Sequence, residues 1–286
     1  MDSTAPMGGR RAKQLRTAVH GVHRTGLTAD DRTGDDELLA FVAEPYTDVE
    51  ETHRRLGDLL RAFEERGDRR AVFLAIYWRM TAAVARGIRD GDFADPDWVG
   101  DYLVAFANLY RQAVHDYERG NVAALPDPWH VAFRATERGD SLVVQDAALG
   151  VNAHINYDLA LALDAAGVGP DRRTKYEDHT AVIDVIADLV DEAQRTLVAR
   201  DADGLAAVDD SLGQLDEWLA VATINECRES AWRTAVAMNS RFRARRRFAH
   251  WWNAVTSKGA AYLILSSQAS DAVHETLADL EQSAES

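Results

Sequence analysis

The segment from Ser141 to Gly167, SLVVQDAALGVNAHINYDLALALDAAG, decides how the rest of the chain is interpreted. Its apolar residues predict one long helix, and Gly167 with Pro170 supplies a stop signal. A buried polar group destabilises a fold unless it finds a hydrogen-bonding partner, so polar residues inside this helix mark either a site or a structural network. The helix carries six of them near its middle: Gln145, Asp146, Asn152, His154, Asn156 and Asp158.

The polar residues of this helix separate into two stripes on a helical wheel. At roughly 100° per residue, His154 and Asp158 share one face in an i, i+4 relation. Gln145, Asn152 and Asn156 fall on the opposite side. The sequence therefore predicts one stripe that combines an imidazole with a carboxylate and a second stripe made of amides.

The pair of His154 and Asp158 has three interpretations. A His and an Asp one turn apart are what a divalent metal takes from one helix. The same pair suits a general base oriented by a carboxylate, or a buried structural hydrogen bond. Glu177, Asp178 and His179 come early on the next predicted helix, so helix pairing could bring Glu177 to the site. We treat His154, Asp158 and Glu177 as candidate catalytic residues, with His154 and Asp158 as candidate metal ligands.

Four further residues are candidates for contact with a substrate: Gln145, Asn156, Arg228 and Trp232. Amides inside a helix also satisfy loop carbonyls or cap a neighbouring helix, so a structural role for the two amides stays open. An arginine on an apolar helix tends to pair with a buried carboxylate, for which Asp158 or Glu177 would be natural partners. The alternative is an arginine stem that lies along the tryptophan ring at the surface.

The rest of the chain also has helical spacing, and no run alternates for long enough to predict a strand. Asp-Pro pairs at 95–96 and 127–128 predict helix starts, because Asp caps a helix and Pro suits its first position. We predict helices at 48–65, 68–88, 96–119 and 127–138, one of about 28 residues after Pro170, then 205–238, 241–256 and 260–267. The fold class is all-α, a single multi-helix bundle-like domain with a central polar-bearing helix (about 141–166).

We divide the chain into three parts. Residues 1–44 lack sustained periodicity and predict a largely disordered arm. The apolar segment at 36–46, where the arm meets the domain, is expected to dock as a short turn. Residues 45–270 form the all-α domain. Residues 271–286 form an acidic C-terminal tail.

The composition favours a soluble cytoplasmic protein. Although 47% of the residues are hydrophobic, no apolar run approaches the roughly 18–20 residues of a membrane span. The single cysteine, Cys227, cannot form a disulfide within the chain and fits a reducing compartment. We interpret Cys227 as a small residue on the face of a helix.

The charge balance is strongly acidic, with a formal net charge of −15, and 29 of the 32 cations are arginine. Such a halophilic-type surface is strongly hydrated, and its overall field repels nucleic acid and anionic membranes. We hypothesise a cytoplasm of high ionic strength, with high-GC coding as the other source of the arginine bias. A melting temperature that stays flat or falls as potassium chloride rises would exclude the salt-adapted interpretation.

Residues 241–253, RFRARRRFAHWWN, interleave five arginines with four aromatic residues. Taken alone, this run suits nucleic acid or a membrane surface. The net charge argues against nucleic acid, and the helical spacing of Ala244, Phe248, Trp251 and Val255 predicts that these residues form a core-facing seam. We therefore expect an arginine face that neutralises acidic neighbours.

Three segments together resemble a known family: QDAALGVNAHINYDLALAL, with GDFADPDW upstream and ECRESAWR downstream. The chain resembles the prokaryotic family catalogued as domain of unknown function 5995, over roughly residues 76–236. The resemblance supplies no activity. Where members of that family often carry His, this chain has Asp146, which puts in doubt an essential imidazole at that position. The resemblance implies that these residues match recurring family positions: Trp98, Gln145, His154, Asn156, Asp158, Glu177, Arg228 and Trp232.

The His-x-x-x-Asp spacing is also similar to that of the all-helical zinc phospholipase C and nuclease group. That group needs several more histidine ligands and a tryptophan at its mature N-terminus. In the same region this chain offers only His115, His130 and His179.

The function that these residues indicate is a small-molecule enzyme or binder with a His/Asp/Glu site. In one version a divalent metal acts as a Lewis acid in hydrolase-like chemistry. The alternative is a non-catalytic scaffold or partner-binding module whose polar helix is a buried structural network. No Gly-rich phosphate loop or Gly-x-Ser-x-Gly elbow is present, which argues against nucleotide-dependent chemistry. The sequence sets neither the reaction nor the oligomeric state.

Overall fold

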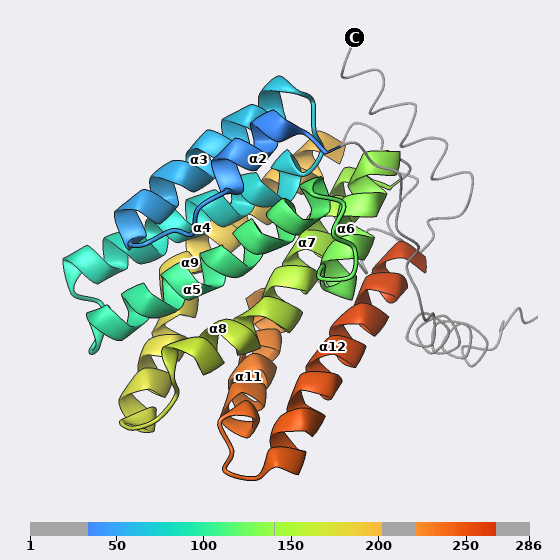
Figure 1. Cartoon of the computed structure of the whole chain (residues 1–286). Helices are drawn as coiled ribbons and strands as arrows, with labels where there is room; N and C mark the ends of the chain where they lie inside the picture. The colour runs from blue at the N-terminus through green and yellow to red at the C-terminus, as the bar shows by residue number, and fades with distance from the viewer. Residues whose placement is uncertain (1–33, 140, 202–220, 267–286) are drawn as a thin grey trace, which may run out of the picture.

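A computed structural model describes residues 34–139, 141–201 and 221–266 of the protein. No strand occurs within these ranges, and the helices pack into one domain, which confirms the all-α prediction (Figure 1). The predictions for most of the N-terminal arm, for the helix between 205 and 220 and for the acidic tail concern residues outside the described ranges.

The first part of the domain contains α2 (Asp36–Val42), α3 (Val49–Glu65), α4 (Ala71–Asp90) and α5 (Pro96–Glu118). Aspartates begin two of these helices as predicted: the Asp48 side chain accepts from the backbone N–H of Glu51, and Asp95 accepts from that of Trp98. The apolar segment that was expected to dock near the N-terminus forms α2, whose Leu38 is buried in the core.

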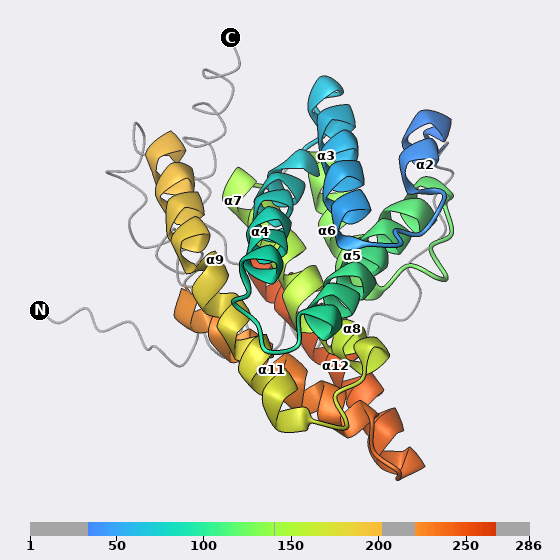
Figure 2. The ribbon, with the colours of Figure 1, turned by 90° about the vertical axis from the view of Figure 1, so that its left-hand side faces the viewer.

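The second part contains α6 (Asp127–Arg138), α7 (Val143–Val151), η1 (Asn152–Asp158), α8 (Leu159–Ala166), α9 (Arg172–Asp201), α11 (Val221–Met238) and α12 (Arg243–Ser266). The three elements α7, η1 and α8 form one continuous rod, which matches the predicted polar-bearing helix. This rod lies between a layer that contains α4 and α5 and a layer that contains α11 and α12 (Figures 1 and 2).

Helix α4 is long and apolar enough, by length and composition alone, to cross a membrane. In the fold it is instead a core helix, packed against α3, α5, α7 and α9. Its buried residues include Phe73, Leu74 and Tyr77. A helix that is apolar on most sides is expected at such a central position.

The buried hydrophobic residues form two clusters that meet at the central rod. One cluster joins α2, α3, α6, α7 and the C-terminal part of α12. The other joins α8, α9, α11 and the N-terminal part of α5. Ala153 belongs to the first cluster and Leu159 to the second, so the short element η1 lies at their junction.

Helix α12 differs from its prediction in two ways. It is one helix through Gly259, where two helices were expected. The predicted seam is also wrong, because Phe248 and Trp251 are exposed. Before its last turn, the buried side of α12 instead consists of small or polar residues, which include Ala249, Asn253, Ser257 and Ala261. Small side chains allow α12 to approach the central rod closely, whereas the aromatic spacing alone could not show which side faced the core.

Candidate functional site

The centre of the polar-bearing helix is a π-helix, η1, rather than regular α-helix. A π-helix has i→i+5 hydrogen bonds, and such turns occur frequently at functional sites. The wider turn leaves residues four apart nearly in line along the helix. Two side-chain pairs with this spacing are hydrogen-bonded here, His154 with Asp158 and Asn152 with Asn156.

The ionisable stripe forms a hydrogen-bonded chain of three side chains. His154 Nδ1 lies 3.0 Å from Asp158 Oδ2, and the Trp129 indole N–H donates to the same oxygen over 2.8 Å. Trp129, His154 and Asp158 are each about 1% exposed. The contribution of Trp129 was not predicted. It lies on α6, 29 residues before Asp158, and only its place just after the Asp127-Pro128 helix start gave it any sequence signal.

Aromatic rings enclose the His154 imidazole. The Phe106 ring stacks on it with 3.5 Å between the ring centroids, and the Tyr77 ring meets it edge-on at 4.3 Å. Phe73 and Trp129 lie farther out, at 5.6 and 6.0 Å. Within the described ranges, His154 Nε2 is buried without any hydrogen-bonding partner. One ring nitrogen is thus held by Asp158, and the other has its hydrogen-bonding capacity unmet.

Burial controls the protonation of this pair. Burial lowers the pKa of His154 well below the usual value. It raises the pKa of Asp158 well above the usual value, although the hydrogen bond from Trp129 acts in the opposite direction and lowers that pKa. The imidazole is therefore neutral at pH 7. The indole N–H can only donate, so Oδ2 accepts from Trp129. We assign the imidazole proton to Nδ1, so that Oδ2 accepts from both rings. Nε2 then carries a lone pair.

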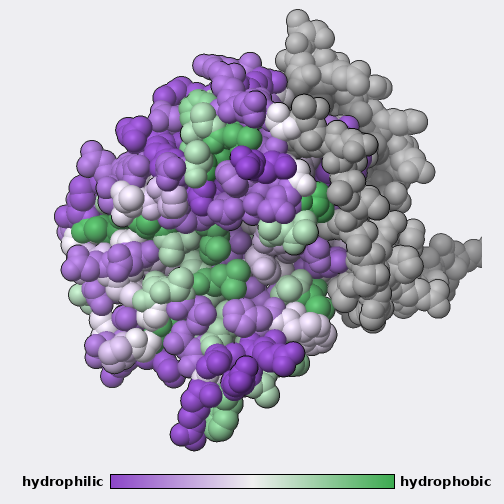
Figure 3. All heavy atoms as spheres, viewed as in Figure 1, coloured by the Kyte–Doolittle hydropathy of each residue, from purple (hydrophilic) through white to green (hydrophobic). Residues whose placement is uncertain are grey.

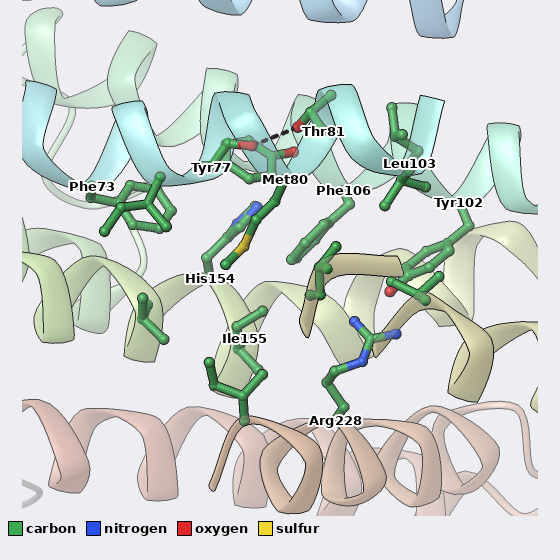
Figure 4. A pocket seen from close by; sticks show the side chains of 16 residues that line it. Phe73, Tyr77, Met80, Thr81, Tyr102, Leu103, Phe106, His154, Ile155 and Arg228 are labelled. Carbon is green, nitrogen blue, oxygen red and sulfur yellow. Dashed lines mark hydrogen bonds between the residues drawn. The ribbon is translucent and has the colours of Figure 1, made fainter. Parts of the chain in front are cut away.

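A cavity of about 70 Å³ lies beside His154, between α4, α5, η1, α9 and α11 (Figure 4). On the same measure a single water needs roughly 10–15 Å³, so the cavity has room for a small organic molecule. Its wall is mainly apolar. The polar or ionisable members of the wall are Tyr77, Thr81, Tyr102, His154 and Arg228.

Arg228 extends from α11 into the wall of this cavity near Tyr102 (Figure 4). It is 3% exposed, and its Nη2 donates to the backbone carbonyl of His179 over 2.6 Å. The guanidinium also lies beside the Tyr102 hydroxyl, where its charge opposes the rise in pKa that burial gives that phenol. Among the described residues no carboxylate lies within ion-pairing distance of Arg228, since Asp158 is bound by His154 and Trp129. The predicted pairing with Asp158 or Glu177 is therefore wrong.

His179 and Trp232 complete the surroundings of Arg228. His179 Nε2 lies 3.2 Å from the backbone carbonyl of Arg228, so the two residues each contact the other's backbone. Burial, together with the nearby guanidinium, lowers the pKa of His179 well below the usual value. The Trp232 ring is buried and stacks on His179 with 5.3 Å between centroids. Neither Trp232 nor His179 is among the residues that line the cavity.

Glu177 lies away from His154 and Asp158. Its side chain is 57% exposed and ion-paired with Arg173. The next residue, Asp178, is the buried one, and it accepts the backbone N–H groups of Ala94 and Asp95 before α5. The structure thus brings together two of the three candidate catalytic residues.

The amide stripe faces α12 and binds its backbone. Gln145 Nε2 donates to the carbonyl of Ile264 over 3.0 Å, and Asn152 Nδ2 donates to that of Ser257 over 2.9 Å. Asn156 donates to Asn152 Oδ1 over 2.9 Å. Neither Gln145 nor Asn156, which the sequence marked as candidate substrate contacts, lines the cavity.

Asp146, the departure from the family pattern, is also in a structural position. Its carboxylate is 1% exposed and forms an ion pair of 2.7 Å with Arg69. The Ser141 hydroxyl donates to its other oxygen. These contacts fix the start of α7 against the start of α4.

A metal site would need more ligands than the structure supplies. Over 34–139, 141–201 and 221–266, no group of three or more His, Cys, Asp or Glu side chains is placed to hold a metal ion. His154 and Asp158 offer two donors, and the atoms nearest each other are already joined by a hydrogen bond. A structural zinc site normally has four ligands and a catalytic one three from the protein.

Comparison with known proteins assigns the family. The model of the family described as "Family of unknown function (DUF5995)" matches residues 49–266. The chain belongs to this family, as its resemblance predicted. No curated protein and no solved structure matches the chain.

Proposed function

We propose that this member of a family without an assigned activity binds a small molecule that has an apolar body and one acidic group, in the cavity beside His154. The observation that supports this most strongly is a pair of polar groups on a mainly apolar wall. They are the Nε2 of His154 and the buried guanidinium of Arg228. Within the described ranges, Nε2 has no hydrogen-bonding partner and the guanidinium has no carboxylate partner. Pockets that are apolar apart from a few convergent polar groups are typical of small-molecule sites.

Arg228 sets the charge of the ligand. Burying a guanidinium without an ion-pair partner is costly, and a ligand carboxylate or similar small anion would remove that cost. The hydrogen bond from Nη2 to the backbone carbonyl of His179 holds the guanidinium in place before any ligand arrives. Such preorganisation increases affinity, because less side-chain entropy is lost on binding.

His154 supplies the second polar contact. A buried nitrogen without a partner costs roughly 1–3 kcal/mol, which a ligand O–H or N–H donating to Nε2 would recover. The same lone pair could accept a proton from the ligand, which makes His154 the candidate catalytic residue. Asp158 and Trp129 would hold the imidazole ring in place, so Asp158 is a positioning residue. Glu177 has no role in this proposal. A second version of the proposal places a metal ion at His154 and Asp158.

Met80 controls access to Nε2 in this proposal. Nε2 is closed off from solvent, and the Met80 side chain lies beside the His154 ring (Figure 4). Met80 lines the cavity and is only partly buried. Its flexible thioether chain can rotate at little cost, which would open Nε2 to a ligand.

The proposal is tested by isothermal titration of the purified protein with small apolar monocarboxylates and with uncharged amides of the same shape. We expect saturable binding of acids but not of amides, lost in Arg228→Gln. Arg111→Gln is the matched control, because Arg111 is also a buried arginine that bonds a backbone carbonyl, but it lies outside the cavity. Equal binding of acids and amides, or binding that persists in Arg228→Gln, would contradict the proposal.

The metal version is tested by elemental analysis of the wild type and of His154→Ala. Stoichiometric metal that disappears in the variant would support a metal at His154 and Asp158. Stoichiometric metal that persists would place it elsewhere in the chain.

A further inference from the structure

Four large aromatic side chains are exposed where α12 begins. Phe242 and Phe248 are each 59% exposed, Trp251 is 55% exposed and Trp252 is 48% exposed. The rings of Phe248, Trp251 and Trp252 contact one another, with centroids 5.6 to 6.5 Å apart. We call these four residues, with the arginines among them, the α12 tip. A contiguous group of exposed aromatics usually marks an interaction surface.

Helix geometry directs the aromatic residues of α12 away from the domain. Ala249 and Asn253 are buried against the rod, and the Asn253 amide donates to the backbone carbonyl of Tyr157 over 2.9 Å. At roughly 100° per residue, Trp251 then points away from the rod, and Phe248 and Trp252 flank it on one side. The end of α12 that carries them, with the turn from α11, forms an extremity of the described molecule in both ribbon views (Figures 1 and 2).

Within the part of the chain that the structure describes, the arginines of the α12 tip have no ion-pair partner. Neutralisation by acidic neighbours was predicted, but none of the five forms an ion pair with a described residue, and all of them are exposed: Arg241, Arg243, Arg245, Arg246 and Arg247. The sequence contains no Asp or Glu between Glu229 and Asp271. In Figure 3 the lower end of the molecule, where α11 turns into α12, is largely hydrophilic with a few hydrophobic atoms among the polar ones.

We propose that the α12 tip binds the surface of a bilayer that contains anionic lipids. Helices that lie in a membrane interface combine Trp and Phe on one side with flanking arginines, whose charged ends reach the headgroups. On α12, Arg245 and Arg247 fall on either side of the aromatic stripe. Each basic residue near an anionic surface strengthens binding, and Trp favours the boundary between lipid and water.

The net charge of −15 does not oppose this binding, because salt limits its range. Charges interact over a Debye length of about 8 Å at physiological ionic strength, so a membrane at the tip is influenced mainly by the tip. A second copy of the chain is a poorer occupant, since a symmetric contact would bring five arginines of each copy together.

The test is co-sedimentation of the full chain with vesicles of phosphatidylcholine alone and of phosphatidylcholine mixed with phosphatidylglycerol. We expect binding to the anionic vesicles only, weakened by salt. Arg245→Ser with Arg247→Ser should lower partitioning about 30-fold at low salt. Arg86→Ser with Arg89→Ser is the matched control, because it removes two exposed arginines from α4 and should leave binding unchanged.

A second readout follows the aromatic residues. Lipids brominated in the acyl chain should quench tryptophan fluorescence of the wild type, and Trp251→Ser with Trp252→Ser should abolish that quenching without lowering the melting temperature, since both rings are exposed. Three results would overturn the proposal. They are no binding to anionic vesicles, vesicle binding that survives the tryptophan substitutions, and binding of duplex DNA or self-association through the tip in place of vesicle binding.

Discussion

The two stripes of the central rod differ in how their polar groups are satisfied. On the amide stripe, the Asn152 side chain bonds both Asn156 and the backbone of α12. On the ionisable stripe, His154 is bonded through Nδ1 alone, and its Nε2 is unpartnered within the described ranges. Complete satisfaction indicates a structural role, whereas one buried unmet nitrogen beside a cavity indicates a site.

The largest effect is expected where the rod meets α4. A Cβ placed on Gly150 would lie 2.4 Å from Cγ of Phe73, the ring that contacts His154 edge-on. Overpacking of this kind displaces buried rings, so Gly150→Ala should lower the free energy of unfolding by about 3 kcal/mol. Denaturant titration measures this effect. A loss below about 1 kcal/mol would show that the contact between the rod and α4 is looser than described.

The amide stripe should respond in stability alone. Asn152→Ala removes the donor to the Ser257 carbonyl and the acceptor of the Asn156 amide. We expect a loss of about 2–3 kcal/mol in the free energy of unfolding, because buried partners are left unsatisfied. The affinity of the folded variant for the ligand should not change. A large change in affinity would show that Asn152 contributes to ligand binding.

The ionisable stripe should respond in the opposite way. His154→Phe replaces a ring whose Nε2 has no partner among the residues that the structure describes, although it removes one bond to Asp158. Because the raised pKa of Asp158 allows that carboxyl to remain neutral, the expected loss is at most about 1 kcal/mol. Ligand binding should be abolished. A loss as large as that of Asn152→Ala would indicate that His154 is mainly structural.

The pH dependence of the same variant tests the protonation of His154. Its pKa is lowered by burial, so below the unfolded value of about 6.5 the unfolded chain binds a proton that the folded chain does not. His154 therefore contributes stability above that pH and loses it as the pH falls. Relative to the wild type, His154→Phe should become more stable by up to about 1.4 kcal/mol per pH unit below 6.5. A pH-independent difference between the two would contradict a neutral buried imidazole.

The smallest effect is expected at Glu177, which lies on neither stripe. Its ion pair with Arg173 is solvent-exposed on both sides. Glu177→Gln should change stability by less than about 0.5 kcal/mol and leave ligand binding intact. Loss of ligand binding in this variant would show that Glu177 contributes to the binding site.

Local sequence signals predicted most helix boundaries and the two stripes. Asp48, Asp95 and Pro96 begin helices where they were expected, because capping depends on neighbouring residues only. The π-helical turn was not predictable, since a regular wheel already placed His154 beside Asp158. The donor from Trp129 and the burial of Arg228 depend on contacts between distant segments, which spacing along the chain does not report.

The outward orientation of the α12 tip was not predictable for a related reason. Aromatic residues at helical spacing usually face a core, and only the neighbouring helices decide which side of α12 is buried. Ala249, Asn253 and Ser257 occupy the buried side because the Asn152 donor needs close access to the α12 backbone. The network that holds the amide stripe thus also turns the aromatics outward.

The central claim is that the neutral His154 carries an available lone pair on Nε2 in a cavity that accepts acids through Arg228. Nitrogen-15 NMR of histidine-labelled protein measures this directly. We predict that the His154 signal stays that of a neutral ring with an unprotonated Nε2 from pH 5 to 8. It should shift on addition of a small apolar monocarboxylate in the wild type but not in Arg228→Gln. A His154 signal that titrates with the usual histidine pKa of about 6.5 would contradict the claim. So would a signal that does not shift when the monocarboxylate is added.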